Sequence, residues 1–292
     1  MKKLLILLIM TGSLFASLRV DTTYATFGAI TQKIGGDLVK VYVLGSSKYD
    51  PHFIVPKPSL LSKLRRADLL IVNGGGLEIG WLPPLIQSAN NRNIQIGAKG
   101  FLDISHSIVM IDKPSSVSRA YGDIHAQGNP HYTTDPHQVP IIAKAIASKL
   151  AQIDPSHAMA YQKNLNTFVT SWKQYLKHYD AKMAVCKTKK VVQYHELYNY
   201  FLRRYHIQSV GNIEPLPGIA PSSKHTLEII NTICSNDVSK ILQDVYHEKR
   251  TAKFIAQKTD AKVVLIPHEV GATPQSDTLE SFYNDIAQKI CQ

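Results

Sequence analysis

The sequence predicts an α/β protein with two lobes, each a mainly parallel sheet flanked by helices, joined by a long backbone helix. Strand-like and helix-like patterns alternate in both halves of the 292-residue chain. Such alternation is typical of parallel sheets covered by helices. Between the two halves, residues 135–180 carry apolar side chains at helical spacing and no strand pattern. Two similar lobes with a helical connection account for both observations.

In the first half, short apolar runs predict strands at residues 18–22, 39–44, 67–73 and 94–96. Residues 27–34, between the first two runs, are apolar at helical spacing, and the glycines that follow predict the end of that helix. We assign residues 17–134 to the first lobe.

The connecting segment, residues 135–180, predicts one long helix with a bend. Asp135 followed by Pro136 is a favourable start, with a carboxylate at the N-cap and proline in the first turn. Asp154 and Pro155 predict a bend or a break, because proline lacks the N–H that a helix interior requires.

The second lobe is assigned to residues 181–292. Strands are predicted at residues 190–194, 208–213, 240–245 and 262–266, and a final helix at 276–290. In open α/β sheets, ligands bind beyond the carboxyl ends of the strands. The predicted binding site therefore lies in the crevice between the lobes.

Residues 1–16 predict a secretory signal peptide. Lys2 and Lys3 precede an apolar run at residues 4–10, and residues 14–16 fit a cleavage site after Ala16. The run is shorter than the about 20 residues that a membrane-spanning helix needs. We expect a periplasmic protein, without a lipid anchor because no cysteine stands at the cleavage point.

The charge of the chain argues against one class of partner. It has 33 basic and 22 acidic residues, a formal net charge of +11, and the basic residues are scattered. In an exported protein this does not indicate nucleic acid, and we expect a monomer that binds none. A positive net charge repels free cations at long range, so any metal site must depend on its local ligands.

Cysteine usage permits a disulfide but not a cysteine-based zinc site. The chain has Cys186, Cys234 and Cys291, and no CxxC pair. An oxidising envelope permits a disulfide. We expect it between Cys234 and Cys291, since both are predicted to end helices of the second half.

Four residues are candidates for one metal site. His52 and His195 follow predicted strands, where their loops reach the crevice, and His131 stands just before the connecting helix. Asp277 follows the last strand and opens the final helix. Zinc takes four ligands tetrahedrally and accepts imidazole nitrogen and carboxylate oxygen. Imidazole favours zinc, whereas all-oxygen sites favour calcium or magnesium.

The other chemical signals have plainer interpretations. His125 is a candidate for a secondary metal contact, with an incidental loop histidine as the alternative. The run of glycines at residues 74–76 lacks the GK(S/T) of a phosphate-binding loop and predicts a turn. Glu78 is interpreted as structural. We expect the other histidines to lie at the surface or to cap helices. They are His137, His157, His178, His206, His225, His247 and His268.

Four segments together resemble the ZnuA/TroA-like family of metal-binding solute receptors. They are residues 50–58 (DPHFIVPKP), 73–82 (NGGGLEIGWL), 129–136 (NPHYTTDP) and 195–201 (HELYNYF). They occur in the family's order through nearly the whole chain. A long histidine-rich loop before the second ligand, which many zinc members carry, is absent or vestigial here.

The resemblance implies two α/β lobes around one buried metal, with His52, His131, His195 and Asp277 as ligands. It implies zinc rather than manganese, because manganese members carry Glu where this chain has His195. The expected function is a zinc receptor that delivers Zn²⁺, as transported ligand rather than cofactor, to an ABC importer permease in the inner membrane. The alternatives are a periplasmic zinc buffer or adhesin on the same fold. A zinc hydrolase is disfavoured, because HExxH and a candidate general base are missing. We therefore expect that the protein is not an enzyme.

Overall fold

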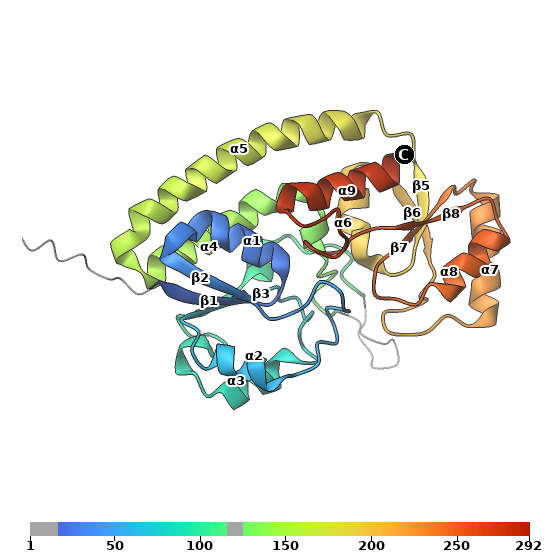
Figure 1. The fold of residues 1–292 in the computed structure, drawn as a ribbon. Helices are drawn as coiled ribbons and strands as arrows, with labels where there is room; N and C mark the ends of the chain where they lie inside the picture. Colours follow the sequence, from blue (N-terminus) through green and yellow to red (C-terminus); the bar gives the residue numbers. More distant parts are fainter. Residues whose placement is uncertain (1–16, 116–124) are drawn as a thin grey trace, which may run out of the picture.

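The computed structural model describes residues 17–115 and 125–292, so the predicted signal peptide lies outside the described residues. The chain forms two sheets of four parallel strands, each flanked by helices, with a long helix running over both (Figure 1). The predicted fold class is confirmed.

The first sheet has the strand order β2-β1-β3-β4. Its central strands place Val20 of β1 opposite Val41 of β2 on one side and Leu69 of β3 on the other. All four side chains of β3 are buried, as expected for a strand covered on both faces. The elements of this sheet and its helices are β1 (Leu18–Thr22), α1 (Ala25–Gly35), β2 (Val39–Val43), α2 (Pro58–Leu64), β3 (Leu69–Val72), α3 (Leu82–Ala89) and β4 (Phe101–Asp103).

The second sheet has the order β6-β5-β7-β8, which repeats the topology of the first. Both sheets place the first and third strands of their set at the centre. The elements are β5 (Lys190–Gln193), α6 (Asn199–Arg204), β6 (Gln208–Asn212), α7 (Ser223–Ser235), β7 (Lys240–Gln243), α8 (Arg250–Gln257), β8 (Lys262–Leu265) and α9 (Leu279–Cys291).

One predicted strand is wrong. Residues 94–96 do not pair with the sheet, and Ile94 ends a 3₁₀ turn with its side chain fully buried. The fourth strand comes later, where Leu102 pairs with Ile71. A strand of three residues carries too short an alternation to be recognised in sequence, and the buried Ile94 produced a similar apolar signal.

The helical connection is divided where proline predicts a bend. Helix α4 (Val139–Ile153) ends before Asp154, a 3₁₀ turn spans Pro155–His157, and α5 (Ala158–Ala184) follows. The two helices pack against each other rather than continuing in one line. Helix α5 alone runs from the first sheet to the second (Figure 1).

A shared hydrophobic core connects the two lobes. Phe27 of α1, Trp172 of α5 and Tyr283 of α9 belong to one continuous buried cluster. The rings of Trp172 and Tyr283 contact edge to face, with centroids 5.7 Å apart. The lobes are therefore held by apolar burial as well as by the connecting helix.

The predicted disulfide is also wrong. Cys186, just after α5, bonds with Cys291 at the end of α9, whereas Cys234 is free and exposed. The reason is packing: α9 lies against α5, while Cys234 lies on the outer face of α7. Among the described residues, no helix is long and apolar enough to cross a membrane.

Candidate metal centre

Two loops at the carboxyl ends of strands carry two of the predicted histidines, His52 and His195. His52 lies between β2 and α2, in a turn whose Pro51 carbonyl accepts hydrogen bonds from Tyr24 Oη at 2.8 Å and Trp81 Nε1 at 3.1 Å. His195 lies just after β5. Hydrogen bonds from the first lobe therefore hold the turn that carries His52, and the second lobe contributes His195.

His131 lies in a segment that both lobes hold. The side chain of Asn73, just after β3, donates to the carbonyl of Pro130 at 3.0 Å. From the second lobe, the carbonyl of Glu196 accepts from Asn129 Nδ2 at 2.8 Å. These bonds fix the backbone on both sides of His131 and place its ring between the sheets.

The turn after β3 supports the same segment. Gly74 has a φ of +76°, and a Cβ there would lie 1.8 Å from a carboxylate oxygen of Asp103, so only glycine fits. The carboxylate of Glu78 accepts from the backbone N–H groups of Asn73 and Gly74 at 2.7 and 3.1 Å. The predicted turn and the structural role of Glu78 are both confirmed.

The structure brings His52, His131 and His195 together. All three are buried, and each offers a ligand atom within 4.8 Å of the other two. The Nε2 atoms of His131 and His195 are 3.2 Å apart. Tetrahedral zinc with nitrogen ligands at 2.0–2.1 Å separates two such nitrogens by about 3.3 Å. The cluster therefore has the dimensions of a metal site.

Two carboxylates orient two of these imidazoles. His52 Nδ1 lies 2.7 Å from Asp50 Oδ1, and His195 Nδ1 lies 2.5 Å from Glu214 Oε2. A carboxylate accepts, so each Nδ1 carries the proton and each Nε2 presents a lone pair to the cluster. Lone pairs that face one another repel, and a cation between them removes that repulsion. The donor set thus fits a metal ion.

Burial keeps His131 neutral. Desolvation first, and then the neighbouring His195 and His52, lower the pKa of His131 well below its usual value. A neutral imidazole is the form that binds a metal ion. At neutral pH, protons therefore do not compete for His131.

The structure does not bring Asp277 to this cluster. Its side chain is exposed, and one carboxylate oxygen accepts from the hydroxyl of Ser281 at 3.1 Å, four residues along the chain. The cause is local: the segment turns back at residues 271–276 and Thr278 then caps α9. We do not retain Asp277 as a ligand.

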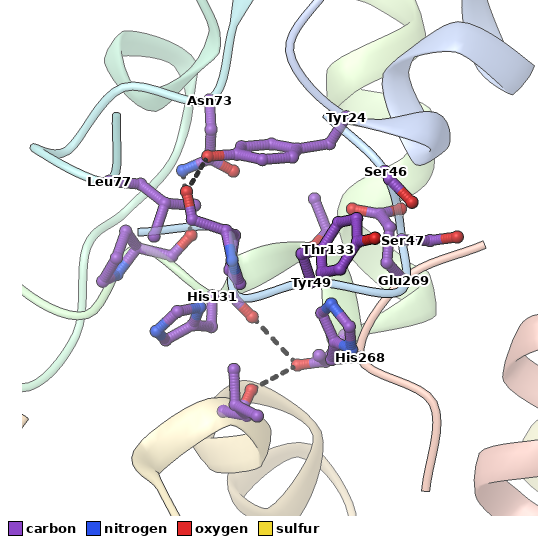
Figure 2. A pocket seen from close by; sticks show the side chains of 14 residues that line it. Tyr24, Ser46, Ser47, Tyr49, Asn73, Leu77, His131, Thr133, His268 and Glu269 are labelled. Carbon is purple, nitrogen blue, oxygen red and sulfur yellow. Dashed lines mark hydrogen bonds between the residues drawn. The ribbon is translucent and has the colours of Figure 1, made fainter. Parts of the chain in front are cut away.

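Two further histidines lie near the cluster, and sequence reasoning considered only His125, as a secondary metal contact. His125 lies beside His52, and His268, expected at the surface, is fully buried; its Nδ1 has no hydrogen-bond partner among the described residues. Burial lowers the pKa of His268 to about 4. His268 and His131 line one pocket of about 20 Å³, room for one water molecule (Figure 2). No pattern along the chain indicated that His268 is buried.

A carboxylate of the second lobe caps a helix of the first. Glu269 Oε1 accepts from the backbone N–H of Thr26 at 2.8 Å and from its hydroxyl, at the start of α1. Burial raises the pKa of Glu269 to about 7, partly offset by these bonds. The contact satisfies an otherwise unpaired helix N–H across the lobe boundary.

Replacing Glu269 is expected to destabilise the protein in a way that depends on the substitution and on pH. Glu269→Ala leaves the Thr26 donors buried without an acceptor and should cost about 1–3 kcal/mol, whereas Glu269→Gln keeps an acceptor and should cost less. Because the folded pKa is raised from the unfolded value near 4.5, the folded state holds the extra proton between these values. The stability of the wild type relative to Glu269→Gln should therefore fall as pH rises from 4.5 to 7.

Denaturant unfolding at pH 5 and pH 7.5 measures this difference. An equal gap between wild type and Glu269→Gln at both values would contradict the raised pKa.

The fold and this cluster define a two-lobed substrate-binding protein with a candidate metal centre. The family model described as zinc-uptake complex component A, periplasmic (ZnuA), matches residues 20–292. The chain belongs to the ZnuA family, and thus to the metal-binding substrate-binding proteins of ABC transporters.

Individual relatives agree on the class. The metal ABC transporter substrate-binding lipoprotein ScbA of Streptococcus cristatus is 27% identical over 204 residues, 68% of this chain and 62% of that protein. A crystal structure of ZnuA superimposes with a TM-score of 0.78 at 25% identity, covering 94% of this chain and 99% of that one.

A structure of FpvC from Pseudomonas aeruginosa in complex with Mn²⁺ matches equally well in fold, with a TM-score of 0.78 at 19% identity, covering 94% of this chain and 98% of that one. Similarity of fold therefore does not distinguish the metals.

Proposed function

We propose that this protein is a high-affinity zinc receptor that binds Zn²⁺ through His52, His131 and His195 and delivers it to an ABC importer. The observation that supports the proposal best is the convergence of three buried imidazoles at metal-ligand spacing. Zinc is the transported cargo. The carboxylates of Asp50 and Glu214 hold two of the ligands in the metal-binding tautomer.

The chemistry of the cluster favours zinc over manganese. Its ligand atoms are imidazole nitrogens, and the nearby carboxylates bond to imidazole N–H groups instead of pointing into the cluster. Carboxylate and water ligands favour manganese, whereas imidazole favours zinc. The family description as a zinc-uptake component is consistent with this choice.

The setting of the function is part of the proposal. The signal peptide of residues 1–16 sends the protein to the periplasm, and a permease in the inner membrane is the partner. The protein acts as a monomer, with lobes at residues 17–134 and 181–292 on either side of the connection at 135–180. It carries no catalytic activity.

We expect the purified protein to bind one Zn²⁺ per chain and to prefer it to Mn²⁺ by several orders of magnitude. The reason is the imidazole-rich shell, whose affinities follow the order Mn²⁺ below Zn²⁺. Elemental analysis after loading and dialysis gives the stoichiometry, and competition on the same sample gives the ratio. Absence of bound metal after loading, or equal affinity for the two ions, would refute the zinc assignment.

A second experiment separates a receptor from a periplasmic buffer or adhesin. The protein should bind its permease, reconstituted in nanodiscs, in a zinc-dependent manner, and should stimulate ATP hydrolysis by the complete transporter. A protein that binds zinc but not the transporter would be a buffer or adhesin on this fold.

A further inference from the structure

His125 lies directly against the three-histidine cluster. Its Nε2 is 3.2 Å from Nε2 of His52, and the two rings are stacked, with centroids 5.2 Å apart and planes inclined by 21°. The same separation, 3.2 Å, joins Nε2 of His131 to Nε2 of His195. Two pairs of imidazole nitrogens thus face each other with nearly the ligand-to-ligand spacing of tetrahedral zinc, about 3.3 Å.

Without a metal, each pair can be closed by one hydrogen bond in which the Nε2–H of His125 or of His131 donates to its partner. His52 and His195 give their Nδ1 protons to carboxylates, so their Nε2 atoms are acceptors. A divalent metal ion would displace those two protons and accept electron pairs at both contacts. His125 joins through His52, because the ligand atoms that all lie within 4.8 Å of one another are those of His52, His131 and His195. We propose that His125 is the fourth ligand, so that the cargo ion is bound by His52, His125, His131 and His195. This inference rests on the proposed function.

The backbone fixes His125 in this position. Its carbonyl accepts from the N–H of Gly128 at 3.0 Å, which closes a tight turn. Its Nδ1 lies 3.5 Å from where a Cβ on Gly76 would be, and Gly76 has a φ of +87°. The ring is therefore confined between the glycine turn after β3 and the side chain of His52.

The electrostatics of the surroundings are suited to four neutral ligands. Four imidazoles leave the charge of a divalent ion uncompensated. The carboxylates of Asp50 and Glu214 supply two negative charges one hydrogen bond away, which neutralises the site as a whole.

This ligand set replaces the one with Asp277. It removes the only carboxylate expected to touch the metal and leaves an all-nitrogen shell. Such a shell disfavours manganese more strongly than three imidazoles with one carboxylate would. His125 is thus a residue that sets metal selectivity as well as affinity.

X-ray absorption at the zinc edge tests the proposal directly, on the full-length mature protein loaded with one equivalent of Zn²⁺. We expect four imidazoles in the wild type and three imidazoles plus one oxygen in His125→Ala. The variant should still bind one zinc, with an affinity lower by about 10- to 100-fold. His125→Gln serves as a second variant of similar size, and thermal unfolding without metal checks that both fold.

His106→Ala is the matched control. His106 is an exposed histidine that lies 3.9 Å from Asp103, and its removal should leave the absorption spectrum and the affinity unchanged.

The outcomes separate the two proposals. If wild type and His125→Ala give the same imidazole count and the same affinity, His125 is not a ligand, although the receptor function stands. If His268→Ala, instead of His125→Ala, lowers the count by one, the fourth ligand is His268 and the inference is overturned. If the wild type binds no zinc, the proposed function and this inference both fail.

Discussion

Replacing His131 with alanine is expected to weaken zinc binding roughly 100-fold and to remove most of the stabilisation that zinc gives. His131 contacts both other members of the three-histidine cluster, with its ring centroid 5.1 Å from that of His195 and 5.2 Å from that of His52. If a protein zinc site provides about 12 kcal/mol and four ligands share it, one ligand accounts for on the order of 3 kcal/mol. By the usual conversion, this is about two orders of magnitude in affinity.

The thermal readout follows by mass action. At a free zinc concentration one thousand times the dissociation constant, binding stabilises the native state by about 4 kcal/mol. A 100-fold weaker site at the same concentration leaves about 1.4 kcal/mol. Differential scanning calorimetry with and without zinc measures the change for wild type and variant.

His106→Ala is again the control, because it removes an exposed imidazole that does not belong to the buried cluster. The control should keep the full zinc-induced rise in melting temperature. If His131→Ala keeps it too, His131 does not bind the metal, and the three-histidine ligand set is wrong.

The fold was predictable because its signals are local. The alternation of apolar runs located seven of the eight strands, and Asp154–Pro155 marked the end of α4. The one strand that was not located, β4, has three residues and only half-buried side chains. A pattern that short cannot be separated from an isolated buried residue such as Ile94.

The three converging histidines were predictable for a different reason. Each follows or precedes a regular element at a known edge of the fold, and parallel topology brings those edges together. His125 was predicted only as a candidate for a secondary contact, and His268 has no such marker. Their positions depend on how the loops pack across the crevice, which the order of residues along the chain does not specify.

Asp277 shows the opposite failure. It has the right chemistry and follows the last strand, but the turn of residues 271–276 and the cap at Thr278 leave its side chain exposed to solvent.

The sequence analysis also missed a polar group that orients one of the ligands. Glu214 lies 19 residues after His195, and only the pairing of β5 with β6 brings the two together.

Breaking the Cys186–Cys291 disulfide is expected to cost about 4–5 kcal/mol of folding stability, the largest structural effect we predict. The bond closes a loop with a sequence separation of 105 residues, and the loss of unfolded-chain entropy on closing a loop of about 100 residues amounts to about 4.7 kcal/mol. It also joins the end of the connecting helix α5 to α9, which packs against it. Without the bond, the end of α9 should fray before the second sheet unfolds.

The double variant Cys186→Ala/Cys291→Ala tests this expectation without leaving thiols that could pair with Cys234. Its melting temperature should fall by on the order of 10 °C for a chain of this size, and a reducing agent should lower the wild type equally while leaving the variant unchanged. Cys234→Ala changes an exposed, free thiol and should alter neither value. Zinc should still bind the double variant, because neither sulfur belongs to the buried histidine cluster. A wild type that is insensitive to reduction would show that the bond does not form in solution, and the tie between α5 and α9 would then depend on packing alone.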